Sequence, residues 1–209
     1  MVSENARVLA QRERLLELEQ QAVAQPPGPL QRRWLRKLAK TYEVEWPGES
    51  VENALQTLLE RVDVVPVSLA LTQAAKESGW GQSRFALEGN NLFGHWCFEE
   101  GCGLVPANRP TGATHEVAAF DSVTQSVRRY LNNLNTHPSY APLRDIRAAQ
   151  RRAGTPLSGL VLADGLIRYS ERRDAYVQDI KQILKANRNL INQAVGQSNR
   201  PQADAEDLS

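Results

Sequence analysis

The sequence predicts a mainly α-helical protein with a small β-hairpin lobe, and three observations support this prediction. Apolar residues recur at helical spacing in stretches such as residues 67–78. That periodicity disappears over residues 95–120, where Gly, Pro, Thr and Asn surround short β-prone pieces. Helical periodicity then returns after Ser122, which is a good N-cap residue. We therefore expect a β lobe of about 95–120 beside a helical lobe.

Composition excludes several classes of protein. The chain has 209 residues, which fits one domain with extensions. Its formal net charge of +1 gives no strong electrostatic attraction to nucleic acid, so no nucleic-acid partner is expected. No apolar run is long enough to span a membrane. Residues 1–19 are charged throughout, so no export signal is visible in them.

The N-terminal part predicts helices outside the main domain. Residues 1–25 form a polar helical extension whose apolar stripe of Leu9, Leu15, Leu16 and Leu18 is thin, so it either docks or stays partly in solution. A Pro-Pro-Gly-Pro run interrupts this helix. Residues 26–64 then predict a helical region packing on the domain, including a helix that Ser50 caps.

The main domain is expected over residues 65–196. Pro66 suits the start of a helix and Gly79 suits its end. After the β lobe, helices are expected over 122–135, 143–153 and 157–166, and from about 173 past 184. Residues 197–209 are polar and without apolar periodicity, so a disordered tail is predicted there.

Glu77 is the candidate catalytic residue. It falls in the last helical turn, on the edge of the apolar stripe. The C-terminus of a helix carries partial negative charge, which disfavours a carboxylate, and an apolar setting raises the pKa of a carboxyl group further. A carboxyl group that stays protonated near neutral pH can act as a general acid. The alternative is an ordinary solvated glutamate at a helix end.

Residues after Glu77 suit the wall of a sugar site. Trp80 stands between two glycines, and Asn90, Asn91, Phe93 and Trp96 follow within a short run. Amides hydrogen-bond to hydroxyl and acetamido groups, and aromatic rings stack on sugar faces. These five residues are therefore the predicted substrate-binding set.

The motif Glu77-Ser78-Gly79-Trp80-Gly81, followed by Asn90-Asn91-Leu92-Phe93-Gly94, resembles the glucosaminidase family of peptidoglycan hydrolases (glycoside hydrolase family 73). Residues 96–106 and 169–172 resemble a subgroup of bacterial envelope proteins in it, and the likeness covers roughly residues 65–184. It implies a lysozyme-like fold and an active-site cleft beside the β lobe. It also implies a periplasmic or envelope location, with any signal already removed, and hydrolysis of the β-1,4 bond after N-acetylglucosamine in peptidoglycan glycan strands. No cofactor is implied.

A second catalytic carboxylate is harder to identify. Retaining glycosidases that use an enzyme nucleophile need one about 5 Å from the acid, and inverting enzymes need one about 6.5–9.5 Å away. The resemblance points to Glu116, since family members carry a second glutamate in this lobe. The lobe is shorter here, and the family's Thr-Thr-Glu-Tyr run is absent unless Thr114-His115-Glu116 replaces it. Other candidates are Glu99, Glu100 and Asp121, and each of these acids is equally consistent with a solvated charge.

A substrate-assisted mechanism needs no second acid, because the 2-acetamido group of the sugar supplies the nucleophile. The resemblance then assigns Tyr169 the role of polarising that group, although Arg168 replaces the family's glycine before it. Tyr176 is a further substrate-binding candidate, although its spacing favours packing of the last helix. Without the resemblance, both would be read as buried structural tyrosines.

The cysteines Cys97 and Cys102 lie close together in the predicted lobe. In an oxidising compartment they favour a short disulfide, and the alternative is two free thiols. The histidines His95, His115 and His137 match no zinc template, so no metal site is expected.

Two other functions stay open at this stage. The motif Glu-Ser-Gly also occurs in lysozyme-like lytic transglycosylases, in which a muramyl hydroxyl attacks and an anhydro sugar forms. A non-catalytic glycan-binding envelope protein is the second alternative, because no second acid is evident. The sequence predicts no oligomeric state.

Overall fold

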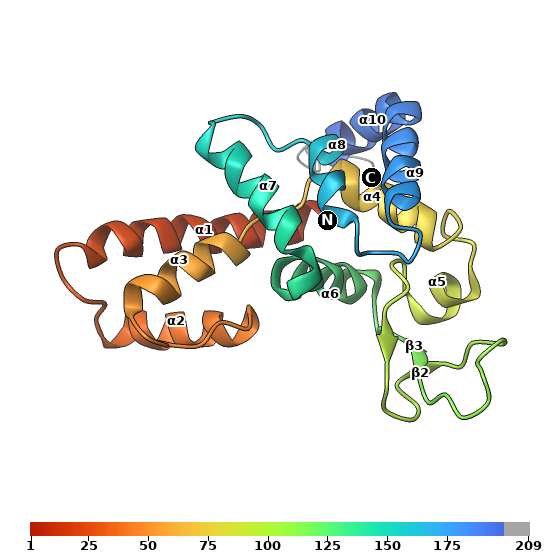
Figure 1. The fold of residues 1–209 in the computed structure, drawn as a ribbon, viewed down its shortest axis with the longest axis horizontal. Helices are drawn as coiled ribbons and strands as arrows, with labels where there is room; N and C mark the ends of the chain where they lie inside the picture. The colour runs from red at the N-terminus through yellow and green to blue at the C-terminus, as the bar shows by residue number, and fades with distance from the viewer. Residues whose placement is uncertain (199–209) are drawn as a thin grey trace, which may run out of the picture.

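The computed structural model describes residues 1–198 and is mainly helical, with a small antiparallel sheet at one end (Figure 1). The helices of this part of the chain are α1 Val2–Ala22, α2 Pro29–Thr41, α3 Val51–Arg61, α4 Val67–Glu77, α5 Arg84–Gly89, α6 Val123–Thr136, α7 Ala141–Arg152, α8 Gly159–Leu162, α9 Asp174–Ala186 and α10 Arg188–Ser198. Short 3-10 helices η1 (Pro138–Tyr140) and η2 (Ala163–Leu166) complete them. The predicted fold class is confirmed.

The helices α1, α2 and α3 form a core of their own and extend away from the other helices (Figure 1). Ser50 caps α3 as predicted, since its Oγ accepts a hydrogen bond from the amide of Asn53. The α1 helix docks through Leu15, Leu18 and Val8. The predicted stripe was wrong at Leu9 and Leu16, which are both exposed.

A buried ion cluster joins this N-terminal core to the rest of the molecule. Asp63, between α3 and α4, accepts two hydrogen bonds from Arg151 of α7, at 2.7 and 3.0 Å. Arg147 of α7 and Arg12 of α1 lie 3.8 and 3.6 Å from the same carboxylate. Burial alone would raise the pKa of Asp63, but these guanidinium groups outweigh it and lower the pKa below its ordinary value. The carboxylate therefore stays ionised between the two cores.

The main core surrounds α4, which packs against α8 and α9. Its fully buried side chains include Leu69, Leu134 and Ile180. At Gly165 of η2 a Cβ atom would collide with the backbone of Leu143 in α7, so only glycine allows this close approach. The main core thus packs closely around the helix that ends at Glu77.

The β lobe contains β1 Trp96–Cys97, β2 Gly103–Leu104 and β3 Glu116–Ala118, in the spatial order β1-β3-β2. Both outer strands are antiparallel to β3, where Val117 lies opposite Trp96 and Leu104. The backbone carbonyl of Val117 fills the space that a side chain at Gly103 would need. The lobe agrees with the predicted span of 95–120.

Two elements differ from the sequence-based expectation. The α5 helix was not predicted, because its six residues are too few to show a helical period. The predicted disordered tail lies outside the described residues, except that the first two residues assigned to it end α10. Over residues 1–198 no helix has the length and apolar character needed to cross a membrane.

Candidate active site

Glu77 is the last residue of α4, and the chain turns sharply after it. The Ser78 hydroxyl donates to the carbonyl of Ala74 at 2.6 Å and accepts from the amide of Gly81 at 2.7 Å. Gly79, Trp80 and Gly81 then have positive φ angles of 58°, 59° and 80°. A left-handed conformation is uncommon for a tryptophan. The turn leaves the Trp80 side chain 64% exposed, three residues after the acid.

The carboxyl group of Glu77 is half-buried, and its Oε1 accepts a hydrogen bond of 2.8 Å from the hydroxyl of Tyr176 in α9. Burial raises the pKa of Glu77 above its ordinary value, against the opposing effects of the Tyr176 hydrogen bond and the charge of Lys76. Lys76 itself is paired with Asp179 at 2.9 Å. The environment thus favours the protonated carboxyl group that a general acid requires.

A chain of buried hydrogen bonds continues behind Tyr176. The side-chain amide of Gln73, one helical turn before Glu77, donates to the Tyr176 hydroxyl at 3.0 Å. Gln73 Oε1 in turn accepts a hydrogen bond of 2.7 Å from the hydroxyl of Tyr130 in α6. Gln73 and Tyr130 are both 0% exposed. Sequence reasoning missed Gln73, and the available signal was its place on the same buried face of α4 as Leu69 and Ala70.

The predicted sugar-binding roles of Asn91 and Phe93 stay predictions, and the structure gives both side chains partners within the protein. Asn91 is buried, and its amide donates to the carbonyls of His95 and Ala118 while its Oδ1 accepts from the amides of Phe93 and His95. Every hydrogen-bonding site of this side chain is therefore used within the protein. The Phe93 ring is buried and stacks on Tyr130, with 4.0 Å between ring centroids. Both residues join the β lobe to the helical lobe.

The other residues predicted to bind sugar differ in their exposure to solvent. Asn90 is in the left-handed conformation that ends α5, and its amide donates to the carbonyl of Phe120 at 2.8 Å. Trp96 is 57% exposed and stacks on His115, with 4.4 Å between the ring centroids. Exposed aromatic faces suit stacking on sugars, so Trp80 and Trp96 stay candidates for substrate contact.

The two tyrosines predicted to act in the site, Tyr169 and Tyr176, both hydrogen-bond within the protein. The Tyr169 hydroxyl donates to the backbone carbonyl of Phe93 at 3.2 Å, so its hydrogen is not free to polarise a substrate amide. Its ring stacks on Tyr176, with 5.3 Å between centroids. Tyr176 does pack α9 as expected, but it is only 2% exposed and binds Glu77 rather than a substrate. The catalytic role of Tyr169 and the substrate-binding role of Tyr176 stay predictions, and in this structure both hydroxyl groups have partners within the protein.

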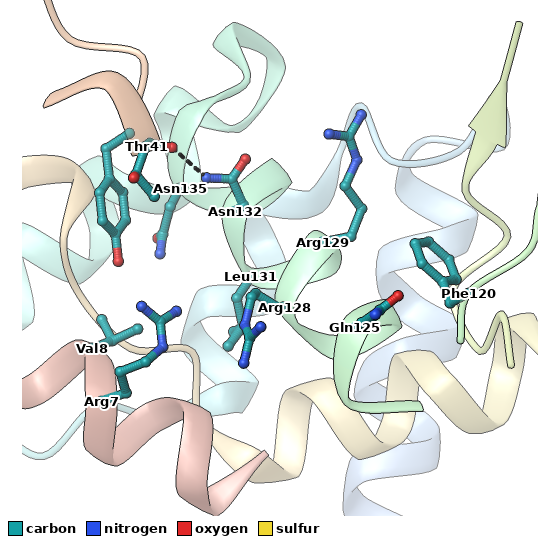
Figure 2. Close-up of a pocket in the computed structure, with 11 residues that line it drawn as sticks. Arg7, Val8, Thr41, Phe120, Gln125, Arg128, Arg129, Leu131, Asn132 and Asn135 are labelled. Atoms are coloured by element: carbon teal, nitrogen blue, oxygen red, sulfur yellow. Dashed lines mark hydrogen bonds between the residues drawn. The ribbon is translucent and has the colours of Figure 1, made fainter. Parts of the chain in front are cut away.

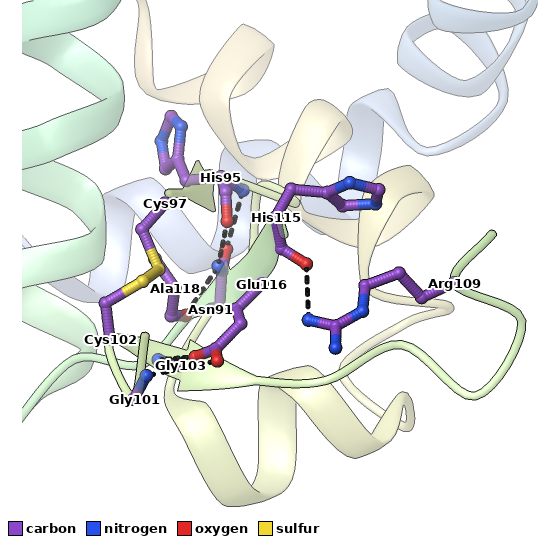
Figure 3. Close-up of a disulfide and its surroundings, with 10 residues drawn as sticks. All are labelled: Asn91, His95, Cys97, Gly101, Cys102, Gly103, Arg109, His115, Glu116 and Ala118. Atoms are coloured by element: carbon purple, nitrogen blue, oxygen red, sulfur yellow. Dashed lines mark hydrogen bonds between the residues drawn. A yellow bond between two sulfur atoms is a disulfide. The ribbon is translucent and has the colours of Figure 1, made fainter. Parts of the chain in front are cut away.

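Glu116 lies inside the β lobe, where Figure 3 shows its side chain pointing toward a glycine-containing turn. Its carboxylate oxygens accept hydrogen bonds from the amides of Gly101 and Gly103, at 3.1 and 2.8 Å. These backbone donors lower the pKa of Glu116 below its ordinary value. The carboxylate is thus engaged in holding the lobe together, and its predicted catalytic role stays a prediction.

The Cys97–Cys102 disulfide beside Glu116 confirms the predicted pairing (Figure 3). Both sulfur atoms are bonded to each other, so the cluster of these cysteines with Glu116 has no thiolate to offer a metal ion. The other acids considered, Glu99, Glu100 and Asp121, are all exposed. The expectation of a cofactor-free reaction stays a prediction.

A cavity of about 430 Å³ lies between α1, the end of α2 and α6, and Glu77 does not line it (Figure 2). Arg7 and Arg128 reach into it, but both bind the carboxylate of Glu4 in α1. The hydrogen bond from Arg128 is the main cause that lowers the pKa of Glu4 to about 2. The ion pair between Glu4 and Arg128 therefore connects α1 to α6.

Comparison with known proteins places the chain in a family. Residues 52–189 match the family model described as "Glucosaminidase: Mannosyl-glycoprotein endo-beta-N-acetylglucosaminidase". The chain is 36% identical over 191 residues to "Protein bax" of Escherichia coli (strain K12), covering 91% of this chain and 67% of that protein. No solved structure matches the chain significantly.

Proposed function

Because the chain belongs to the glucosaminidase family, we propose that it is a peptidoglycan hydrolase with Glu77 as its general acid. The proposed substrate is the glycan strand, cut at the β-1,4 bond after N-acetylglucosamine. Family membership supports a glycosidase-type enzyme acting on a glycan, and the specific bond is our inference from the motif around Glu77.

The observation that carries the proposal is the environment of the Glu77 carboxyl group. It is half-buried at the end of α4, its pKa is raised by burial, and Tyr176 holds one of its oxygens. In the proposed reaction Glu77 gives its proton to the leaving glycosidic oxygen as the bond to C1 breaks. The exposed rings of Trp80 and Trp96 would hold neighbouring sugars by stacking.

The acetamido group of the substrate is our preferred nucleophile. Its carbonyl oxygen attacks C1 as the glycosidic bond breaks, which forms a cyclic oxazolinium intermediate. A water molecule then adds to C1 and reopens this ring, while the Glu77 carboxylate accepts the proton of that water. The engaged state of the Glu116 carboxylate favours this route over one with two enzyme carboxylates.

A periplasmic or envelope location is part of the proposal, because this polymer lies outside the inner membrane. The disulfide between Cys97 and Cys102 is consistent with an oxidising compartment.

The test is to digest purified sacculi and identify the products by mass spectrometry. Products with reducing-end N-acetylglucosamine are expected from the wild-type protein and not from Glu77→Gln. Anhydromuramyl ends would instead identify a lytic transglycosylase, the second candidate that a single acid also favours. Binding to sacculi without any soluble product would identify a non-catalytic glycan-binding protein.

A further inference from the structure

The buried hydrogen bonds behind Glu77 have a definite direction. Resting on the proposed role of Glu77, we propose that Gln73 is a positioning residue that directs the Tyr176 hydroxyl hydrogen onto the acid. Tyr130 sets the orientation of the Gln73 amide, and none of these three residues needs to touch the substrate.

The direction follows from which atoms can donate. Tyr130 donates to Gln73 Oε1, so the amide nitrogen of Gln73 faces Tyr176. An amide nitrogen only donates, so the Tyr176 oxygen must accept this hydrogen bond. The hydroxyl hydrogen of Tyr176 is then available for Glu77 Oε1, at 2.8 Å.

This direction also decides which carboxyl oxygen holds the transferable proton. Oε1 of Glu77 accepts a hydrogen bond, so in the protonated acid it acts as the carbonyl oxygen. The acidic proton therefore lies on Oε2. A fixed position of this proton favours its transfer, because general acid catalysis depends on the geometry of the transfer.

Two aromatic stacks hold the ends of the hydrogen-bond chain in place. Phe93 stacks on Tyr130, and Tyr169 stacks on Tyr176. The Tyr169 hydroxyl then donates to the Phe93 carbonyl, which connects the two stacks. Phe93, from the second family-like motif, thus belongs to the packing behind the acid.

The charged and titratable groups around Glu77 come from every element near it. Lys76 of α4 is paired with Asp179 of α9, which also binds Arg172. Tyr130, Tyr140, Tyr169 and Tyr176 supply the phenol groups, and burial, the first cause in each case, raises the pKa of all four. These tyrosines therefore stay neutral while Glu77 titrates.

The experiment is to follow the side-chain carboxyl carbon of Glu77 by NMR during a pH titration of protein labelled with ¹³C-glutamate. The resonance that disappears in Glu77→Gln gives the assignment. Tyr176→Phe removes a donor to the ionised carboxylate, so the Glu77 titration should move to higher pH. Gln73→Met should move it in the same direction by less, because the hydroxyl loses its fixed orientation.

The double variant Gln73→Met/Tyr176→Phe separates a positioning role from a structural one. Since Gln73 acts through Tyr176, the double variant should titrate like Tyr176→Phe alone. The matched control is Gln56→Met, which changes an exposed glutamine of α3 and should leave the titration of Glu77 unchanged. Tyr130→Phe keeps the buried amide of Gln73 and should move the Glu77 titration slightly to higher pH. This variant replaces Gln73→Met in the test if Gln73→Met does not fold.

An unchanged titration in folded Gln73→Met, or shifts that add in the double variant, would overturn the proposal. Because the NMR titration does not depend on hydrolysis, this result is independent of the proposed function. Where hydrolysis is measured, the basic limb of the kcat profile should move with the titration while KM stays constant. A change in KM alone would also contradict a positioning role.

Discussion

Glu77 and Glu116 are two shielded glutamates with opposite pKa shifts, and the difference lies in their donors. Glu77 meets one hydroxyl donor at the end of a helix, and burial raises its pKa. Glu116 is only 5% exposed, yet two backbone amides lower its pKa. The helical side of the molecule therefore raises the pKa of a carboxyl group, whereas backbone amides in the β lobe stabilise a carboxylate in its charged form.

This comparison teaches that burial alone does not identify a catalytic acid. A carboxylate that accepts several backbone hydrogen bonds is stabilised in its charged form, whatever its exposure. The useful question is whether the ionised or the protonated form has the better partners. By that measure Glu77 is the candidate acid and Glu116 is not.

The largest effect is expected from Glu77→Gln. General acid catalysis contributes about 10²–10⁴-fold, so hydrolysis of sacculi should fall by at least that order while the fold and glycan binding persist. Dye release from labelled sacculi measures the rate. Glu88→Gln is the matched control, because Glu88 is an exposed residue of α5. Near-normal hydrolysis by folded Glu77→Gln would end the proposal for this residue.

Glu116→Gln should affect the lobe more than the chemistry. The new side-chain NH₂ group cannot accept, so one of the two amides at Gly101 and Gly103 loses its partner. Hydrogen exchange at these amides should become faster. The rate of hydrolysis should fall by less than about 10²-fold, which is the smallest loss expected when a general acid is removed. A loss as large as that of Glu77→Gln would instead support a mechanism with two carboxylates.

The pH dependence of stability should report the lowered pKa of Glu116. Because the pKa of Glu116 is lower in the folded than in the unfolded protein, its contribution is present above the unfolded pKa. That contribution is lost as the pH falls through the folded pKa. The difference in melting temperature between wild type and Glu116→Gln should therefore shrink on acidification. A difference that grows at low pH would contradict the assigned direction.

The smallest effect is expected from Tyr169→Phe. This change removes one hydrogen bond, to the Phe93 carbonyl, and keeps the ring that stacks on Tyr176. The cost in free energy of unfolding should be about 1 kcal/mol, measured by urea denaturation. Hydrolysis should stay near the wild-type rate. A loss of 10²-fold or more would restore the catalytic role that the sequence suggested for Tyr169.

The sequence predicted the parts of the site that depend on local signals. Pro66, Ser50 and Gly79 mark helix boundaries through their own backbone or side-chain chemistry, so the helix that ends at Glu77 was foreseen. Gln73 was not, because its partners Tyr130 and Tyr176 lie 57 and 103 residues away along the chain.

Asn91 shows the same limit of local signals. Its amide pattern suited a sugar, but its partners are backbone groups of the lobe that only the folded chain brings together. The partners of the Glu116 carboxylate were also not foreseen, since no sequence signal reveals two amides converging on it. Local chemistry could therefore place the acid but not the residues that orient it.

The ion cluster at Asp63 has a consequence for how the molecule unfolds. Arg12 belongs to the N-terminal core and Arg147 to a helix of the main core, and both face this one buried carboxylate. Separating the cores would leave charges without partners in a poorly solvated place, which costs more than the contact between two exposed ions. The N-terminal core and the main core are therefore expected to melt cooperatively, with a single calorimetric transition as the signature.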